Sequence, residues 1–381
     1  MIISVVGSGG KTTLIKKLAA QYRSEGKTVL VTTTTHMFIE KDALLTDDAG
    51  TIIGVLQKTG YAMAGIPEGE KIKALSKETF DNLCAFADVI LVEADGSKCL
   101  PLKYPNTTEP VIPENTDEII VVCGLNAIGE KAKDVCHRLE LVKTCLGVED
   151  DTVITPVHVQ KLVTDGYLTP LQKAYPNAKI SVRPRHDGSL YQRAIASLLQ
   201  NEQDVSLIQK EWFSPQPTLF ICGGGHVAKE VAATFENLRK AGFSEDQIST
   251  IFAPIGLPIG AVTPAEIAFS ILGQIIQEKN KHHAASADKA LLTVTESGML
   301  CIITEKLGSA PRDVGSMMFV GKERILGSIG GGEPEYRAIS HARANPAFSI
   351  REYALNRAAA NGLDMICSGT IKVVFIPISQ C

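Results

Sequence analysis

The start of the chain predicts a strand, a glycine loop and a helix in immediate succession. The first 13 residues read MIISVVGSGGKTT, and residues 14–22 continue as a helical stretch. In this arrangement successive backbone N–H groups and a helix N-terminus point at a bound anion, and a lysine adds positive charge. The residues predicted to bind phosphate are Gly7, Gly9, Gly10, Lys11, Thr12 and Thr13.

The spacing of the glycines and the lysine in this loop differs from that of the common phosphate-binding motif. Gly7-x-x-Gly10-Lys11-Thr12 is two residues tighter than the common Gly-x-x-x-x-Gly-Lys-Thr motif. The shorter form resembles the loop of ATP-dependent amide ligases such as the Mur enzymes. Lys11 would contact the β- and γ-phosphates, and the Thr12 hydroxyl would bind Mg²⁺. A glycine turn with a surface lysine is the plainer alternative.

A carboxylate at the end of a neighbouring strand would complete such a site. Residues 89–92 predict a buried strand, and Glu93 and Asp95 follow at its carboxyl end, where open α/β sheets bind ligands. We predict Thr12 and Glu93 as Mg²⁺ ligands and Lys11, Glu93 and Asp95 as catalytic candidates; a solvated turn is the alternative for each carboxylate.

Two further patterns bear on the same site. Residues 32–35 are four threonines, which are either hydroxyls beside the phosphates or β-branched strand residues. His36 follows them, and a capping or core role is at least as common as catalysis. The guanine-specifying Asn-Lys-x-Asp motif is absent from residues 182–187, which favours ATP while GTP stays open.

The chain as a whole alternates strand-like and helix-like segments, which predicts an α/β fold. Strands are expected at residues 2–6, 28–31, 89–92, 118–123 and 179–182, with helices at 76–86 and 157–165 between them. A proline-containing break at 202–217 and a polar run at 278–288 divide the chain. We expect a P-loop-like parallel sheet with helices on both faces (residues 1–205), a partial Rossmann unit (218–280) and a small α+β domain (288–381), the last with strands at 300–304, 316–320 and 372–377.

Composition excludes several classes of function. The net charge is −4 and no long basic run occurs, so nucleic-acid binding is not expected. No apolar segment approaches the ~18 residues of a membrane span, and the N-terminus lacks the pattern of a signal peptide. Nine scattered cysteines without paired spacing suit a reducing compartment. These features predict a cytoplasmic protein.

Four motifs of the first 200 residues carry a family resemblance. Residues 6–13, 31–37, 93–98 and 109–113, in this order, resemble the YqeC family. Its members are regarded as accessory proteins of selenium-dependent molybdenum hydroxylases. The resemblance implies a nucleotide-binding accessory factor.

The middle of the chain contains another glycine turn. Residues 220–228 fit the dinucleotide fingerprint, with Gly223 and Gly225 as candidate cofactor-binding residues. Together with residues 253–261 and 263–272 they resemble the Rossmann domain of XdhC-type proteins, which mature the molybdenum cofactor of xanthine dehydrogenase. No strand ending in a ribose-binding acid follows about 20 residues later, so we expect a truncated unit, which argues against NAD(P) binding and leaves dinucleotide binding open. Its exposed edge would be covered by another domain or a partner.

The last segment resembles the small XdhC domain, which normally precedes the Rossmann part. The resemblance is carried by residues 304–313, 326–332 and 365–369. The backbone N–H groups of its glycine loops can bind an oxyanion, and Arg312 offers hydrogen-bond donors that fit phosphate. Cys367 could bind a soft atom such as sulfur, selenium or molybdenum. The cofactor-binding candidates are Ser309, Arg312, Gly330, Gly331 and Gly332, and the catalytic candidate is Cys367, for which a buried structural cysteine is the alternative. Glu333 stands where the XdhC pattern often has cysteine, which favours binding of the cofactor without chalcogen transfer.

Both resemblances indicate one pathway. We expect an accessory factor that binds ATP (or GTP) with Mg²⁺ at the N-terminal loop and the molybdenum cofactor (molybdopterin) through the C-terminal part, and passes the cofactor to an apo molybdenum hydroxylase. NTP hydrolysis and a homodimer stay open. The alternatives are an ATP-dependent ligase or kinase with a vestigial XdhC-like tail, and a non-catalytic docking scaffold.

Overall fold

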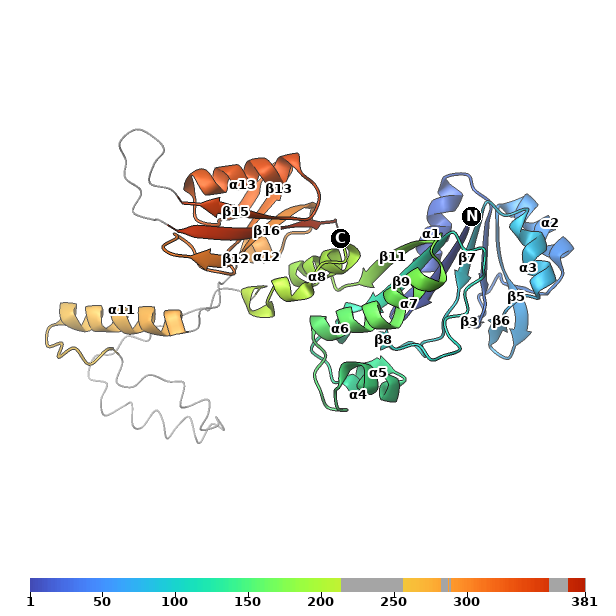
Figure 1. The fold of residues 1–381 in the computed structure, drawn as a ribbon, viewed down its shortest axis with the longest axis horizontal. Coiled ribbons are helices and arrows are strands. Elements are labelled where there is room, and N and C mark those ends of the chain that lie inside the picture. The colour runs from blue at the N-terminus through green and yellow to red at the C-terminus, as the bar shows by residue number, and fades with distance from the viewer. Residues whose placement is uncertain (214–255, 282–286, 288, 356–368, 381) are drawn as a thin grey trace.

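Two main β-sheets with helices packed on them, and one small two-stranded sheet, make up the described part of the protein (Figure 1). The computed structural model describes residues 1–213, 256–281, 287, 289–355 and 369–380. Gly223, Gly225 and Cys367 lie outside these residues, as does the glycine turn at residues 220–228. No helix among the described residues has the length and apolar character needed to cross a membrane.

The larger sheet has nine strands and is mostly parallel. Its order is β11-β9-β1-β7-β2-β5-β6-β3, with β4 beside β5. The pairs from β11 to β5 are parallel, so these strands end at one edge. The bounds are β1 Ile2–Gly7, β2 Val29–Thr33, β3 His36–Phe38, β4 Leu44–Leu45, β5 Tyr61–Glu68, β6 Lys71–Lys73, β7 Val89–Glu93, β9 Glu118–Gly124 and β11 Lys179–Arg185.

Helices cover both faces of this sheet, as the alternation of its apolar residues requires. Helix α1 (Lys11–Ser24) packs with Ile3 and Val5 on one face, and Ile2 and Val6 face the other core. The longer helices that contribute to that second core include α2 Ala49–Thr59, α3 Lys77–Cys84, α6 Pro156–Val163 and α8 Leu190–Gln200. The predicted α/β class with a parallel sheet is confirmed.

Shorter elements connect these layers. They are the helices α4 Ala132–Val135, α5 Leu139–Leu146 and α7 Thr169–Ala174, a π-helix at Thr164–Leu168, 3₁₀ turns at Leu125–Ala127, Val205–Leu207 and Lys210–Phe213, and the two-stranded pair β8 Leu102–Lys103 with β10 Cys136–His137.

The smaller sheet is antiparallel and has five strands. Its order is β14-β13-β12-β16-β15. Helix α13 (Gly332–Ala344) packs on one face through Ala338 and Ala342. The other elements are β12 Gly298–Leu307, β13 Met317–Gly321, β14 Ile325–Gly327, β15 Ser349–Ala354, β16 Thr370–Ile378, α11 Pro264–Lys281 and α12 Lys289–Leu292. The expected small α+β unit is confirmed.

Helix α8 contacts both sheets, because it packs on β11 and on β16 (Figure 1). Its buried Arg193 donates hydrogen bonds to the carbonyl oxygens of Val294, of Glu296 at 2.8 Å and of Ser379 at 2.6 Å. One helix of the N-terminal part thus forms part of the core beneath the smaller sheet. The division of the chain into three domains stays a prediction.

Candidate functional site

The N-terminal glycine loop, residues 7–13, joins β1 to α1 in the predicted order. Gly7, Gly9 and Gly10 have φ values of +88°, +83° and +136°, which glycine adopts without steric cost. A Cβ on Gly7 would lie 2.1 Å from the carbonyl oxygen of Val122. No side chain caps α1, and its first turn contains no acidic residue. The first N–H groups of α1 therefore have no capping side chain and lie at the positive end of the helix dipole.

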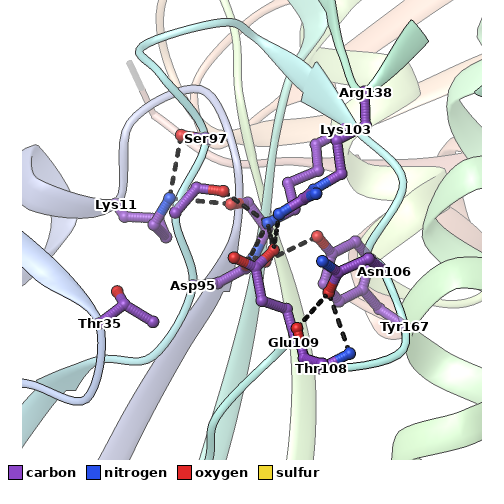
Figure 2. Close-up of polar contacts among 12 residues, drawn as sticks. Lys11, Thr35, Asp95, Ser97, Lys103, Asn106, Thr108, Glu109, Arg138 and Tyr167 are labelled. Carbon is purple, nitrogen blue, oxygen red and sulfur yellow. Dashed lines mark hydrogen bonds and ion pairs between the residues drawn. The ribbon is translucent and has the colours of Figure 1, made fainter. Parts of the chain in front are cut away.

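Lys11 is buried at this loop, with 4% of its surface exposed. Its Nζ donates to the Gly7 carbonyl oxygen at 2.9 Å and to Ser97 Oγ at 3.1 Å, the latter contact shown in Figure 2. Burial lowers the pKa of Lys11, while the charges of Glu93 and Asp95 oppose the shift. A buried lysine held by neutral oxygens can exchange them for a phosphate oxygen without moving far.

Thr12 and Glu93 are hydrogen-bonded to each other. The Thr12 hydroxyl donates to Glu93 Oε2 at 2.9 Å, because β7 lies beside β1 and both end at the same edge. Burial raises the pKa of Glu93, against the opposing effects of Lys11 and Thr12. Hydroxyl and carboxylate oxygens are ligands that Mg²⁺ accepts, usually together with water and substrate phosphates.

The described residues contain no preformed metal centre. No group of three or more histidine, cysteine, aspartate or glutamate side chains among them is placed to hold a metal ion. A cation at this loop would therefore be held by Thr12, Glu93 and the phosphates of a ligand, which fits the way nucleotide-bound Mg²⁺ is usually coordinated.

Asp95 is fully buried and fully engaged. Its Oδ2 accepts hydrogen bonds from the Gly7 N–H at 3.1 Å and from the Tyr167 hydroxyl at 2.8 Å, and its Oδ1 is paired with Lys103. The arrangement makes Asp95 a residue that fixes the end of β1, since both its oxygens already have partners (Figure 2).

The network around Asp95 extends away from the loop. Lys103 Nζ lies 2.5 Å from Glu109 Oε2, which also accepts from Arg138 Nη2 at 2.9 Å. Tyr167 belongs to the π-helix, an irregularity that often marks functional sites. Burial, followed by the adjacent Asp95, raises the pKa of Tyr167 well above its usual value. Lys103, Arg138 and Tyr167 were not predicted, because their spacing matches no motif.

The threonine run is used mainly for structure. The Thr32, Thr33 and Thr34 hydroxyls donate to the carbonyl oxygens of Ala64, Glu93 and Val111. These bonds tie the end of β2 to its neighbours, and the Thr35 hydroxyl lies 3.4 Å from that of Thr33, so all four hydroxyls have partners. His36 is exposed on β3 and forms a 2.6 Å contact with Glu68.

Arg185 lies at the N-terminal loop and was not among the predicted site residues. It is the last residue of β11, and a Cβ on Gly10 would lie 3.1 Å from its Cδ and 3.6 Å from its Nη1. Its place three residues after the strand expected at 179–182 was the available signal.

The second glycine loop, Ser328–Gly332 of the smaller unit, holds a carboxylate of its own chain. Glu335 Oε2 accepts hydrogen bonds from Ser328 Oγ at 2.6 Å, the Ile329 N–H at 2.9 Å and the Gly331 N–H at 3.0 Å. The Gly330 N–H donates to Ser328 Oγ at 3.1 Å. Burial disfavours this carboxylate, but the hydrogen bonds outweigh burial and lower the pKa of Glu335. An incoming anion would have to displace Glu335.

Two of the predicted C-terminal residues, Gly330 and Arg312, lie close together, and Ser309 lies close to Gly369. A Cβ on Gly330 would lie 3.7 Å from Arg312 Cγ, and one on Gly369 would lie 2.4 Å from the Ser309 carbonyl oxygen. Ser309 and Arg312 are exposed, and Gly332 begins α13. Their role in cofactor binding stays a prediction.

The fold and the loop define an α/β protein with a glycine loop and buried lysine at the carboxyl edge of a parallel sheet. Residues 3–140 match the model of the YqeC protein family. Residues 228–275 match the XdhC Rossmann domain, and residues 291–349 match the XdhC and CoxI family. The chain thus joins a YqeC-type segment to two XdhC-type segments, as predicted, with the Rossmann part first.

Two proteins of Escherichia coli (strain K12) are similar to parts of the chain. The YqeC protein is 34% identical over 167 residues, which are 40% of this chain and 63% of that protein. The YqeB protein is 44% identical over 52 residues, which are 14% of this chain and 10% of that protein. The chain therefore spans less than two thirds of either relative.

A solved structure matches only weakly. It is a xanthine dehydrogenase from Bacillus halodurans, with 22% identity, a TM-score of 0.21 and coverage of 23% of this chain and 28% of that one. The XdhC-type matches are what supports a link to the maturation of a molybdenum hydroxylase.

Proposed function

We propose that the protein is an accessory factor for a molybdenum hydroxylase, which binds a Mg²⁺-nucleoside triphosphate, ATP in preference to GTP, at the N-terminal glycine loop. The observation that carries the nucleotide half is the pair Thr12–Glu93 at 2.9 Å beside the buried Lys11, at the uncapped start of α1. The XdhC-type segments support the second half, in which the C-terminal part binds the molybdenum cofactor and passes it to the apo-enzyme.

The chain's own groups assign the roles at the loop. The N–H groups at the start of α1 bind phosphate oxygens, and Lys11 turns from Gly7 to a phosphate. Thr12 and Glu93 hold the cation, which when bound neutralises phosphate charge. Asp95 keeps Gly7 in place through its 3.1 Å contact with the Gly7 N–H. Binding is the primary role in this scheme, with hydrolysis as a step that could reset the protein.

The nucleotide half is tested by calorimetric titration of the full chain with ATP in the presence of Mg²⁺. Replacing Lys11 removes charge-assisted hydrogen bonds, so Lys11→Ala should weaken ATP binding about 100-fold. Lys16→Ala is the matched control, because Lys16 lies on the same helix, is exposed and pairs with Glu40 at 2.9 Å. Equal affinity of the wild type and Lys11→Ala would contradict the assignment.

The cofactor half is tested by titrating the full chain with molybdenum cofactor and following the absorbance of the bound fraction, with and without ATP. We expect binding at micromolar protein, and a weaker signal in Cys367→Ala if that thiol contacts the cofactor. Absence of binding under both conditions would overturn this half and leave the nucleotide half standing.

A further inference from the structure

Arg185 is directed toward the N-terminal glycine loop by the register of the sheet. In the parallel pair of β11 and β9, Arg183 lies opposite Val122 and Arg185 opposite Gly124. Val122 belongs to the core that α1 covers. Residues paired across a parallel ladder share a face, and side chains two residues apart also do. Both arginines therefore lie on the α1 face, with Arg185 at the carboxyl edge.

Among the residues that the structure describes, none pairs with the guanidinium of Arg185. Its side chain is exposed, and no hydrogen bond or ion pair joins it to another residue of the described ranges. Its contact is with Gly10, where a Cβ would lie 3.1 Å from Arg185 Cδ. Any side chain at position 10 would crowd this arginine, so the glycine leaves room for it over the start of α1.

The buried charges at the loop leave the negative charge of a bound polyphosphate without enough positive partners. Lys11 lies among the charges of Glu93 and Asp95, and Lys103 is paired with Asp95 and Glu109. The buried charges near the loop thus largely neutralise each other. A polyphosphate carries several negative charges, and an unpaired arginine offers five N–H donors in a fork that fits phosphate oxygens.

From this geometry we propose that Arg185 is a phosphate-binding residue of the N-terminal loop, which closes over the polyphosphate chain of a nucleotide from the side of β11. The proposal rests on the proposed function and adds its third element, after the α1 N-terminus and Lys11. It assigns the end of β11 to the same site, although β11 and β1 are separated by β9.

The chain offers a closely matched control. Arg183 is exposed, lies on the same strand and face, and carries the same charge. The register places it two residues before Arg185, opposite Val122, and so further from the carboxyl edge of the sheet. A general effect of surface charge would appear in both arginines, whereas a specific contact would appear only in Arg185.

The experiment is calorimetric titration of the full chain and its variants with ATP and with ADP, each with Mg²⁺. Arg185→Ala should weaken the binding of both nucleotides about 10- to 100-fold. The affinity of Arg185→Lys should lie between that of Arg185→Ala and that of the wild type. Arg183→Ala should bind within about threefold of the wild type, as expected for a screened surface charge. Circular dichroism melting of each variant shows whether it is folded.

Three outcomes separate the possibilities. If Arg185→Ala is folded and binds like the wild type while Lys11→Ala does not, the proposal is wrong and the proposed function stands. If Arg183→Ala loses as much affinity as Arg185→Ala, the effect is general electrostatics and the proposal is wrong. If the wild type itself binds neither nucleotide, both the proposal and the proposed function fail.

Discussion

The glycine loops at residues 7–13 and 328–332 look alike in sequence and differ in what occupies them. Each precedes a helix, α1 or α13, and each helix has a glycine at its N-cap, Gly10 or Gly331. At the N-terminal loop the first turn of α1 has no acidic residue and no side-chain cap. At the second loop the carboxylate of Glu335, one turn into α13, accepts the N–H groups of Ile329 and Gly331.

The difference shows that a glycine turn before a helix predicts an anion site only together with the residues that follow it. A carboxylate in the first turn satisfies the loop from within and favours the helix dipole. The first loop has a lysine, a threonine and a carboxylate from the neighbouring strand, and no acid in the first turn of its helix. An external anion can therefore bind there. The predictions below exchange or remove these features.

The largest expected effect comes from giving the first loop an acid of its own. Thr13 is exposed in the first turn of α1. Thr13→Glu places a carboxylate near the phosphates, and at a few ångströms this repulsion should weaken ATP binding about tenfold or more in a titration. Thr13→Gln, of equal size and without charge, should lose clearly less affinity for ATP than Thr13→Glu. Equal loss in both variants would attribute the effect to size instead.

A smaller effect is expected from removing the acid of the second loop. Glu335→Gln loses the charge that Ser328 and two N–H groups contact, so the free energy of unfolding should fall by about 1 kcal/mol in denaturant titrations. Glu333→Gln is the control, because Glu333 also lies in the first turn and instead pairs with Arg337. A larger loss from Glu333→Gln would contradict this reading of the loop.

The effect of Glu335 should depend on pH. Its pKa in the folded protein is lowered, so its carboxylate stabilises the fold at pH values above the ordinary pKa of glutamate. This stabilisation is lost as the pH falls through the lowered pKa. The difference in melting temperature between the wild type and Glu335→Gln should therefore be full at neutral pH and shrink under acid conditions; a difference that grows on acidification would refute it.

Replacing Glu93 at the first loop is expected to have the smallest effect on stability, and this effect has the opposite sign. Burial raises the pKa of Glu93, so the folded protein favours its protonated form and its contribution becomes unfavourable as the pH rises from the ordinary value through the raised one. Glu93→Gln should therefore raise the melting temperature slightly at neutral pH while removing the gain in ATP affinity that Mg²⁺ provides. A lower melting temperature, or an undiminished Mg²⁺ effect, would contradict this role.

The sequence predicted much of the larger sheet because its central strands are short apolar runs followed by polar residues. All five expected strands, β1, β2, β7, β9 and β11, occur within a few residues of their predicted bounds. Strand β5 was missed, since Gly65 and Pro67 interrupt it, although it continues the parallel sheet beside β2. Local propensity cannot reveal a strand that is fixed by pairing with its neighbours.

Candidate residues divide in the same way. Lys11, Thr12 and Glu93 follow from a local loop and the order of two strands, and the structure brings them together. The partners of Asp95, Lys103 and Tyr167, come from distant segments and follow no spacing rule. The role of Glu335 was also missed, because its position in the sequence does not show that its side chain folds back onto the glycine loop. Tertiary placement decides such contacts.

Hydrogen exchange of the full chain, measured by mass spectrometry with and without saturating Mg²⁺-ATP, tests the contrast between the loops most directly. Peptides that cover residues 8–14 should become protected on addition of ATP, because their N–H groups bind phosphate. Peptides that cover residues 328–332 should not change, since Glu335 already accepts from that loop. Protection at the second loop, or none at the first, would contradict the account.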